Sequence, residues 1–414
     1  MLDVAVIGGG AAGFFAAINI KILHPDKDVQ IFEKSSTCLG KVKISGGGRC
    51  NVTHHCFDPV VLSKFYPRGS KELISVFNRF NPEHTIAWFE EQGIRLKVES
   101  DGRMFPVTDD SQTIINCFVD FCKSRQIAIH TRSGIKSINR IDKHFELQTE
   151  SEVISCRKLV ITSGSSEVFW NMLAEMGHDI IPPVPSLFTF NIKNDLIEDL
   201  PGLSVPRASV KLDVEKSLLK AFKLSEAECT QTGPLLITHW GLSGPAILKL
   251  SSIAARLLHH VNYRFDIQIS FSNLRLEDTL EVLTQFKSQN TKKQIINTPL
   301  FEIPARWWNR LHALTFENTY ITWSDISKKD LNKLAMNLCA YPLEVEGKST
   351  FKDEFVTAGG VNLKEVDFKT MESKIIPGMH FAGEVLNIDA LTGGFNFQAA
   401  WSEAWVISRS IFNY

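Results

Sequence analysis

Hydrophobic residues occur along the chain in two patterns, short apolar runs and longer stretches with helical spacing. A buried strand is predicted at residues 3–7, a helix at 14–23 and a second strand at 29–33. Glycines at positions 8, 9, 10 and 13 separate the first strand from the body of the helix. This order is typical of the βαβ unit that opens many nucleotide-binding domains.

A proline-rich stretch at residues 181–185 divides the rest of the chain into two blocks. Helical spacing predicts helices over residues 71–80, 82–92, 111–125, 276–289, 305–314, 328–338 and 395–411. Apolar runs predict strands at residues 127–130, 134–141, 145–149, 153–156, 158–164, 188–192, 208–214, 228–232, 263–271 and 379–386. We therefore expect an α/β domain and a second, strand-rich domain that begins after the prolines.

The spacing Gly8-x-Gly10-x-x-Gly13 lies between the first predicted strand and helix. Glycines at these positions permit the tight turn, the close approach of a pyrophosphate and the packing of helix on strand. Glu33 ends the second strand, where a carboxylate accepts hydrogen bonds from ribose hydroxyl groups. The pattern predicts a dinucleotide site; the alternative is a glycine-rich turn that binds nothing.

FAD and NAD both contain ADP, so the first motif does not distinguish them. The C-terminal segment favours FAD. Gly393 and Gly394 open the predicted terminal helix. A reduced flavin carries negative charge near N1, and a helix N-terminus stabilises an anion there. The alternative is an ordinary docking helix, because Phe397, Trp401 and their neighbours form an apolar face. Both interpretations can hold, since the face packs while the terminus binds.

A glycine-rich, basic segment follows at residues 41–51. Gly46, Gly47 and Gly48 precede Arg49 and Asn51, so the backbone can approach a cofactor closely. The segment is not a P-loop, because valine follows the Gly-Lys pair at 40–41. It predicts a second part of the cofactor site.

Two further groups of residues suggest chemistry but leave alternatives open. Cys50, His54 and the neighbouring His55 and Cys56 match no standard zinc spacing, so no metal site is predicted. Cys50 could lie beside the flavin, but it has no second cysteine at the spacing of a redox dithiol. His239 and Trp240 are candidates for a substrate pocket, and the alternative for His239 is a structural histidine whose hydrogen bonds are satisfied. Ser243 is expected to cap the helix that starts near Pro245.

Composition excludes several classes of protein. Lys plus Arg is 45 and Asp plus Glu is 46, a net charge of −1, so no nucleic-acid partner is expected. The eight cysteines contain no CxxC pair, which indicates reduced thiols and a cytoplasmic location. No apolar run reaches 18 residues, so no transmembrane helix or membrane partner is expected. Asp3 stands where a signal peptide would be basic.

The motifs resemble those of the HI0933-like flavoprotein family, whose members include the YhiN and BaiN proteins. They are Val6-Ile-Gly-Gly-Gly-Ala-Ala-Gly13, Lys43-Ile-Ser-Gly-Gly-Gly-Arg-Cys-Asn-Val-Thr53, Gly102-Arg-Met-Phe-Pro106, Thr238-His-Trp-Gly-Leu-Ser-Gly-Pro-Ala246, Gly383-Glu384 and Thr392-Gly-Gly-Phe-Asn-Phe-Gln398. Departures are His54 after the asparagine–valine–threonine sequence and Ser163-Gly164-Ser165 in place of a more usual Ala-Thr-Gly-Gly turn.

The resemblance implies the fold and its division. We expect an α/β protein with a Rossmann-like FAD-binding domain and a parallel sheet at residues 1–187 and 352–414. An insert domain at 188–351 is expected to hold a β-barrel-like part and a helical part at about 274–338. The predicted cofactor-binding residues are Gly8, Gly10, Ala11, Ala12, Gly13, Glu33, Lys34, Lys41, Ser45, Gly46, Gly47, Gly48, Arg49, Cys50, Asn51, Ile135, Ser163, Gly164, Gly383, Glu384, Asp389, Gly393, Gly394, Phe395 and Asn396.

The predicted function is that of an FAD-dependent oxidoreductase that transfers a hydride between flavin and a small organic substrate. NAD(P)H or O₂ is the expected electron partner. Because the chain has a single complete dinucleotide motif, no separate nicotinamide domain is expected, and any NAD(P)H would visit the flavin transiently. His239, Arg49 and His54 are the candidates for catalysis. The alternatives are a non-catalytic or redox-sensing FAD protein and an RNA-modifying flavoenzyme. The sequence does not indicate an oligomeric state.

Overall fold

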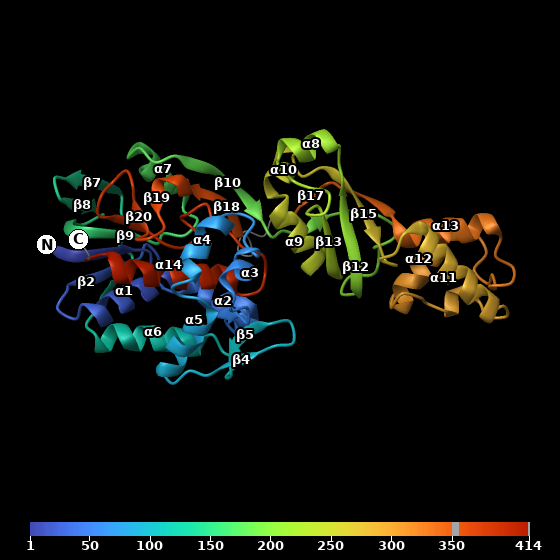
Figure 1. The fold of residues 1–414 in the computed structure, drawn as a ribbon, viewed down its shortest axis with the longest axis horizontal. Coiled ribbons are helices and arrows are strands. Elements are labelled where there is room, and N and C mark those ends of the chain that lie inside the picture. Colours follow the sequence, from blue (N-terminus) through green and yellow to red (C-terminus); the bar gives the residue numbers. More distant parts are fainter. Residues whose placement is uncertain (350–355, 413–414) are drawn as a thin grey trace. The chain divides into compact units, whose positions relative to one another are not determined.

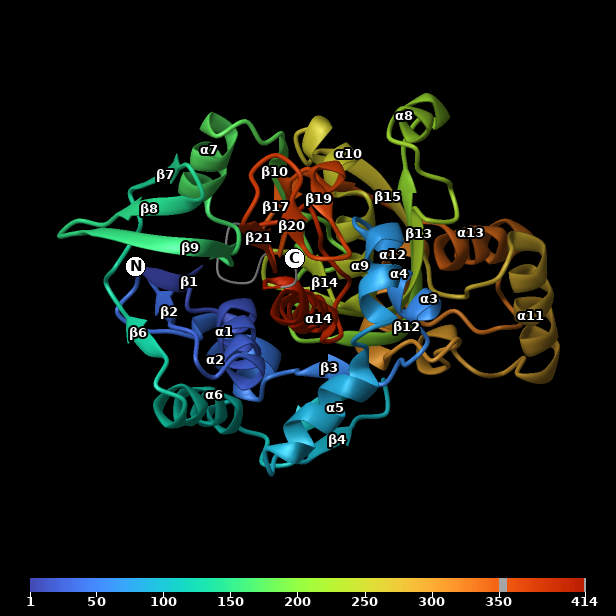
Figure 2. The same cartoon turned by 60° about the vertical axis from the view of Figure 1, so that its left-hand side comes forward.

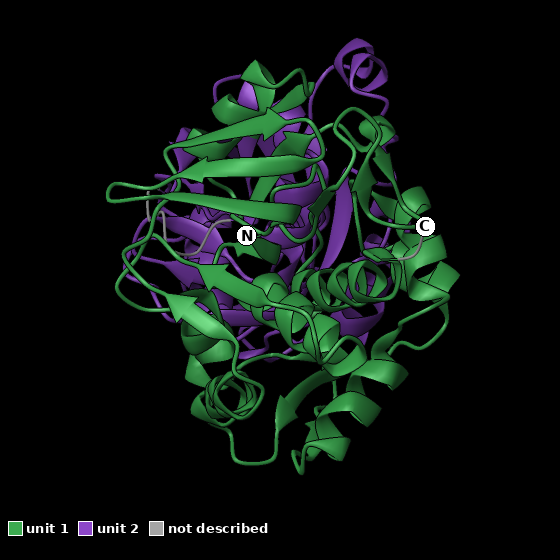
Figure 3. Ribbon diagram, turned by 90° about the vertical axis from the view of Figure 1, so that its left-hand side faces the viewer, with its two compact units in different colours: residues 1–183, 357–414 green, residues 184–356 purple. Residues whose placement is uncertain are grey.

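The computed structural model describes residues 1–349 and 356–412, and the chain divides into two compact units (Figure 3). Unit 1 comprises residues 1–183 and 357–414, and unit 2 comprises residues 184–356. The sequence places the first boundary after residue 187, whereas the structure divides the chain inside the proline-rich stretch. The boundary expected after residue 351 lies outside the described residues.

A parallel sheet forms the centre of unit 1. Its strands follow the order β21 (Met379–Phe381), β9 (Val153–Ile161), β1 (Leu2–Ile7), β2 (Val29–Phe32) and β6 (Ala128–His130). All four pairings between these neighbours are parallel. This is a Rossmann-like order, and a ligand binds such a sheet at the carboxyl ends of β1 and β9, where the order reverses.

Antiparallel strands extend the sheet on the side of β9. β7 (Ser137–Ile141) pairs with β8 (His144–Gln148), which pairs with the first half of β9. The sequence predicts two strands where the structure has β9 alone, because polar residues at 157 and 158 interrupt the apolar run. The strand continues through them, since its first half pairs with β8 and its second half with β1 and β21. β19 (Val366–Asp367) and β20 (Glu372–Ser373) extend the other edge at β21.

Helices α1 (Ala11–Leu23) and α14 (Phe395–Ser410) pack side by side in unit 1, as Figure 1 and Figure 2 show. The Trp401 ring lies 5.2 Å from the ring of Phe15 and 5.6 Å from that of Phe118, centroid to centroid. The N-terminal motif and the C-terminal helix, far apart in sequence, therefore share one core. The remaining helices of unit 1 are α2 (Gly40–Gly48), α3 (Pro59–Ser63), α4 (Ser70–Phe77), α5 (Pro82–Glu91), α6 (Gln112–Ser124), α7 (Glu167–Glu175) and the 3-10 turn η3 (Leu363–Glu365).

The glycine-rich segment begins as a helix rather than a loop. Helix α2 starts at Gly40, and its helical backbone breaks at Ser45, Gly46 and Gly47, where φ of the two glycines is +58° and +70°. The segment then leads into a small antiparallel sheet of β3 (Thr53–His54), β5 (Arg103–Pro106) and β4 (Leu96–Val98). Positive φ angles that glycine tolerates thus end the helix and turn the chain toward this sheet.

Unit 2 has its own hydrophobic core and an antiparallel sheet. The strand order is β16 (Tyr341–Val345), β15 (Phe265–Ser270), β12 (Ser204–Asp213), β13 (Thr230–Thr238), β14 (Gly241–Ser243), β11 (Phe190–Asn191) and β17 (Gly347–Lys348). Strands β16 and β17 are parts of one extended segment interrupted at Glu346, so this segment pairs with β15 at its start and with β11 at its end. The sheet thereby closes on itself in the barrel-like form that was expected.

Helices complete unit 2. α11 (Leu276–Gln289), α12 (Ala305–Thr315) and α13 (Lys328–Cys339) lie together in Figure 1 at the place of the expected helical part. The others are α8 (Lys216–Ala221), α9 (Pro245–Ile253), α10 (Ala255–His260) and the 3-10 turn η1 (Ile295–Asn297). β10 (Ile180–Ser186) pairs with β18 (Val356–Val361), and most residues of both strands belong to unit 1. Within 1–349 and 356–412, no helix has the length and apolar character needed to cross a bilayer.

Candidate cofactor site

The glycines of the first motif differ in what they require. Gly8 has φ +109°, and a Cβ placed on it would lie 2.3 Å from the carbonyl oxygen of Thr162. A Cβ on Gly13 would lie 2.0 Å from the carbonyl oxygen of Gly8. Gly10 has an ordinary φ of −93°, and a Cβ there would meet no atom within 4 Å. The fold therefore requires glycine at 8 and 13, whereas at Gly10 the open space at the start of α1 fits a bound pyrophosphate.

Glu33 lies at the end of β2, as predicted, and holds the loop. Its Oε2 accepts a hydrogen bond from the backbone N–H of Gly9 at 2.7 Å, and its Oε1 accepts one from Ser35 N–H at 2.8 Å. Each carboxylate oxygen can accept more than one hydrogen bond, so both retain capacity for ribose hydroxyl groups. Lys34 beside it is exposed, and Ile135 is buried.

The end of β9 faces the same loop. The single hydroxyl proton of Thr162 is shared between the carbonyl oxygens of Ile7 and Gly8, which lie 2.8 and 3.0 Å from Oγ1. Ser163 Oγ is buried and has no hydrogen-bond partner among the described residues, and Gly164 follows with φ +62°. A buried hydroxyl group is normally paired, so this one fits a site that a polar ligand completes. The sequence indicated Ser163 and Gly164 but not Thr162.

The turn at Gly383 and Glu384 joins this site from the C-terminal part of the chain. Gly383 has φ +81°, and a Cβ on it would lie 3.3 Å from Cβ of Ala12 in the first turn of α1. Glu384 forms an ion pair with Lys41 of α2. The structure thus brings together residues from the first motif, the glycine-rich segment and the C-terminal motif.

The start of α14 packs against the glycine-rich segment. A Cβ on Gly394, which has φ +87°, would lie 2.5 Å from the carbonyl oxygen of Thr53 and 2.7 Å from Oδ1 of Asn51. Asn396 accepts a hydrogen bond from Ala390 N–H at 3.0 Å, which fixes the chain before the helix. The two segments that the sequence assigned to the flavin therefore contact each other.

An aromatic stack lies at this helix start. The ring of Phe395 lies 4.3 Å from that of Phe65 and 4.5 Å from that of His54, centroid to centroid. His54 Nε2 lies 3.1 Å from the carbonyl oxygen of Asp101. Burial lowers the pKa of His54, and the hydrogen bond to the backbone of Asp101 raises it by a smaller amount. Because a carbonyl oxygen only accepts, Nε2 carries the proton and Nδ1, buried and without a partner among the described residues, is a hydrogen-bond acceptor.

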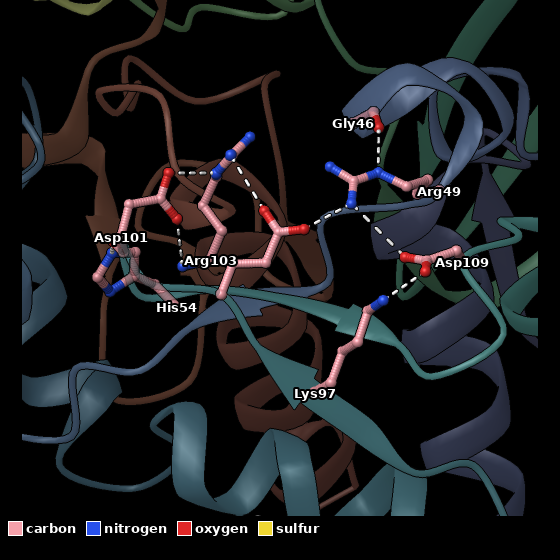
Figure 4. Close-up of polar contacts among 8 residues, drawn as sticks. Gly46, Arg49, His54, Lys97, Asp101, Arg103 and Asp109 are labelled. Carbon is pink, nitrogen blue, oxygen red and sulfur yellow. Dashed lines mark hydrogen bonds and ion pairs between the residues drawn. The ribbon is translucent and has the colours of Figure 1, made fainter. Parts of the chain in front are cut away.

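Arg49 is held by acidic residues, as Figure 4 shows. Its guanidinium group lies 2.6 Å from Glu99, 3.5 Å from Asp109 and 3.9 Å from the centre of the Phe105 ring. Hydrogen bonding to Glu99 raises the pKa of Arg49. In the same network Lys97 pairs with Asp109, and Arg103 pairs with Glu99 and Asp101. Arg49 therefore fastens the end of the glycine-rich segment to the β4–β5 hairpin.

Other predicted residues have structural surroundings. Cys50 is fully buried, and burial raises its pKa to about 12, so no thiolate forms there near neutral pH. Ser45 Oγ donates to the carbonyl oxygen of Val42 at 2.9 Å. Asp389 is fully buried in an ion pair with Arg68, a residue that no motif indicated.

The third motif lies in unit 2. His239 and Trp240 are exposed on the turn between β13 and β14. The expectation that Ser243 caps a helix is wrong: Gly244, with φ +94°, is the N-cap of α9, and Ser243 Oγ accepts a hydrogen bond from Thr189 Oγ1 at 3.0 Å. The glycine takes the cap because its backbone conformation is one that side chains disfavour.

Across the described ranges 1–349 and 356–412, no three His, Cys, Asp or Glu side chains gather as metal ligands would.

Comparison with known proteins gives the family. The family model of the HI0933-like protein Rossmann domain matches residues 2–410. The chain is 27% identical to the ribosomal RNA dihydrouridine synthase of Escherichia coli K12 over 99% of this chain and 98% of that protein. It is 24% identical to the 3-dehydro-bile acid delta(4,6)-reductase of Clostridium scindens over 99% of each chain.

A solved structure also resembles the chain at low identity. The 3-ketosteroid-delta4-(5alpha)-dehydrogenase of Rhodococcus jostii RHA1 has a TM-score of 0.48 and 11% identity, over 99% of this chain and 96% of that one. The family match covers nearly the whole sequence, and the glycine positions, the acid at the end of β2 and the sheet order agree with a Rossmann-like FAD site. The chain belongs to the HI0933-like family of FAD-dependent oxidoreductases.

Proposed function

We propose that the protein reduces a carbon–carbon double bond conjugated with a carbonyl group in a small organic substrate, with NAD(P)H as the electron donor. The observation that carries the proposal is the meeting of three distant segments in unit 1: the open space at Gly10, the turn at Gly383 beside Ala12, and the start of α14 against Asn51. When bound, FAD supplies hydride transfer between the reductant and the substrate.

The relatives narrow the reaction class. A dihydrouridine synthase saturates a uracil double bond that is conjugated with a ring carbonyl, and a delta(4,6)-reductase of a 3-dehydro-bile acid acts on double bonds conjugated with the 3-oxo group. The two substrates differ in size and class, but the bond that is reduced is of one kind. Support for this reaction therefore does not depend on which substrate the present chain takes.

The chain's own residues are assigned to binding and positioning. The N–H groups at the start of α1 bind the pyrophosphate, and Glu33 binds the ribose. The start of α14 stabilises negative charge on the reduced ring. His54 offers Nδ1 as an acceptor for an N–H or O–H group, so it binds a ligand and does not donate a proton from that atom. His239 is kept as a candidate for substrate contact, and Arg49 as a residue that positions the loop.

Reduction of uridine in ribosomal RNA is a second candidate function. The observation that favours it is the E. coli relative, which aligns over 98% of its length. The net charge of −1 favours a small molecule over RNA. The two substrates are therefore tested in parallel.

The test starts from purified holoprotein under anaerobic conditions. NADH or NADPH is expected to bleach the flavin absorbance, and a panel of α,β-unsaturated ketones is expected to restore it in the absence of O₂. Ribosomal RNA from a strain that lacks the gene for this protein is incubated with NADPH, with and without the protein, and analysed for dihydrouridine by mass spectrometry. Gly10→Val, which should not bind FAD, is the matched control.

The outcomes separate the candidates. Restoration by ketones alone supports the small-molecule reductase, and new dihydrouridine alone supports the RNA enzyme. A flavin that NAD(P)H does not reduce contradicts both and favours a redox-sensing FAD protein.

A further inference from the structure

Glu403 is a fully buried acid that the proposed reaction does not use. It lies on α14 with no exposed surface. Its Oε2 accepts a hydrogen bond from the backbone N–H of Gly383 at 2.6 Å. Its Oε1 has no hydrogen-bond partner among the described residues. Among the described residues the carboxyl group therefore makes one hydrogen bond, to the turn that reaches the first motif.

The surroundings of Glu403 favour its uncharged form. Burial raises its pKa to about 8, and the hydrogen bond from Gly383 opposes this shift only in part. A buried carboxylate is costly unless it is paired, and Glu403 takes part in none of the ion pairs of the described residues. At neutral pH the side chain is therefore a carboxylic acid whose carbonyl oxygen accepts from Gly383.

Neighbouring charges do not compensate for ionisation. Tyr66, whose hydroxyl group donates to the carbonyl oxygen of Phe395 at 2.6 Å, is the titratable group that interacts electrostatically with Glu403. Burial raises the pKa of the Glu403 carboxyl group, the Gly383 hydrogen bond lowers it, and no Lys, Arg or His of the described residues forms an ion pair with it. The charged or titratable residues on the elements packed against α14 are Lys21 of α1, His54 of β3, Lys71 and Glu72 of α4, and Glu83, His84, Glu90 and Glu91 of α5.

The contact matters because of where Gly383 lies. Its left-handed backbone places it against Ala12, in the first turn of α1, where the pyrophosphate is expected. The next residue, Glu384, pairs with Lys41. Glu403 therefore holds one side of a turn whose other side is held by α2, next to the anion-binding end of α1.

We propose that Glu403 is a positioning residue for the cofactor: its uncharged carboxyl group holds the Gly383–Glu384 turn against α1, and loss of its proton weakens FAD binding. A carboxylate accepts a stronger hydrogen bond from Gly383 than the neutral acid does, but two effects of ionisation outweigh this gain. A buried negative charge near the turn repels the two negative charges of the pyrophosphate, and the need to solvate that charge loosens the packing around Gly383. The inference rests on the position of the FAD site but not on the substrate.

The test measures the dissociation constant of FAD from the full-length protein at pH 6.5 to 9. The wild type is compared with Glu403→Gln, which accepts the same hydrogen bond and cannot ionise, and with Glu403→Leu, which lacks the acceptor. We expect wild-type affinity to fall progressively as the pH rises through 8, by up to about tenfold per pH unit. Glu403→Gln should bind as tightly as the wild type at pH 6.5 and keep that affinity at pH 9. Glu403→Leu should bind about tenfold more weakly throughout, without the pH dependence.

Each outcome decides the matter. A Glu403→Gln variant whose FAD affinity falls with pH as the wild type's does would overturn the proposal, as would equal, pH-independent affinity in all three proteins. If Glu403→Leu does not fold, the slopes of the wild type and Glu403→Gln still decide. A Gly10→Val variant that binds FAD normally would instead show that the FAD site itself is misplaced, so the two failures are distinguishable.

Discussion

The glycines of the first motif offer a direct test, because the same substitution should lower the free energy of unfolding at Gly8 and the affinity for FAD at Gly10. Gly8→Ala forces a side chain into a backbone with φ +109°, 2.3 Å from the Thr162 carbonyl oxygen. The disfavoured conformation costs about 1–2 kcal/mol and the overlap about 1–3 kcal/mol, so a loss of roughly 2–5 kcal/mol is expected. Gly10→Ala meets no atom within 4 Å and keeps an allowed φ of −93°, so its unfolding free energy should change by at most about 1 kcal/mol.

FAD affinity should show the reverse pattern. At Gly10 the added methyl group takes space that the pyrophosphate needs. A loss of about 1–3 kcal/mol in binding free energy from this overpacking corresponds to a dissociation constant for FAD that is larger by roughly 5- to 150-fold. Denaturant unfolding of the apoproteins measures the first effect, and quenching of FAD fluorescence on titration with apoprotein measures the second. Wild-type FAD affinity in Gly10→Ala, or wild-type stability in Gly8→Ala, would refute the reasoning.

Three further predictions follow from buried and crowded groups. Between pH 4.5 and 8 the folded wild type keeps the Glu403 proton, whereas the unfolded chain loses it, so the wild type's free energy of unfolding falls as the pH rises. The Glu403→Gln apoprotein cannot ionise there, so it should be more stable than the wild type by about 1.4 kcal/mol per pH unit above 4.5, up to about 5 kcal/mol near pH 8. Urea unfolding at several pH values checks this. Cys50, buried and with its pKa raised to about 12, should resist iodoacetamide at pH 8 until the protein is unfolded, and peptide mass spectrometry should detect labelling only then. In Gly394→Ala the new Cβ would lie 2.5 Å from the Thr53 carbonyl oxygen, so the start of α14 should be displaced. The reduced flavin anion then loses the stabilisation that the helix N-terminus gives it, and the midpoint potential should fall by roughly 6–20 mV. A rise in the potential, measured by spectroelectrochemistry, would contradict the assigned role of this helix.

At the predicted cofactor site, the sequence indicates the backbone conformation wherever local chemistry sets the residue type. A strand that ends before Gly8 and a helix that starts after Gly10 are local features, and so are the positive φ angles of the glycines at 46, 47, 393 and 394. Most of the helices are also local, since their apolar spacing is regular: the helix expected over residues 276–289 is α11, Leu276–Gln289. Short-range patterns of this kind reflect steric and hydrophobic constraints that hold before any tertiary contact forms.

Side-chain states were decided by tertiary packing. Arg49 looks like a free cation in a glycine-rich loop, but the β4–β5 hairpin, about fifty residues later, supplies Glu99 to bind it. Cys50 looks reactive beside an arginine, yet burial removes its thiolate. A single sequence does not indicate these partners, because the energy of a charge depends on which distant groups surround it.

Glu403 shows most clearly the difference between what the sequence indicates and what tertiary packing decides. In the sequence it is the one acid of the terminal helix and lies between Trp401 and Trp405, and that contrast is the signal by which it could have been noticed. Its protonation and its hold on Gly383 arise only because α14 packs against α1 and excludes water from the carboxyl group. The sequence by itself determined where the chain can turn and which faces are apolar, because those are properties of neighbouring residues; the tertiary structure decided which polar groups are charged, because charge depends on solvent access and on partners that are far away along the chain.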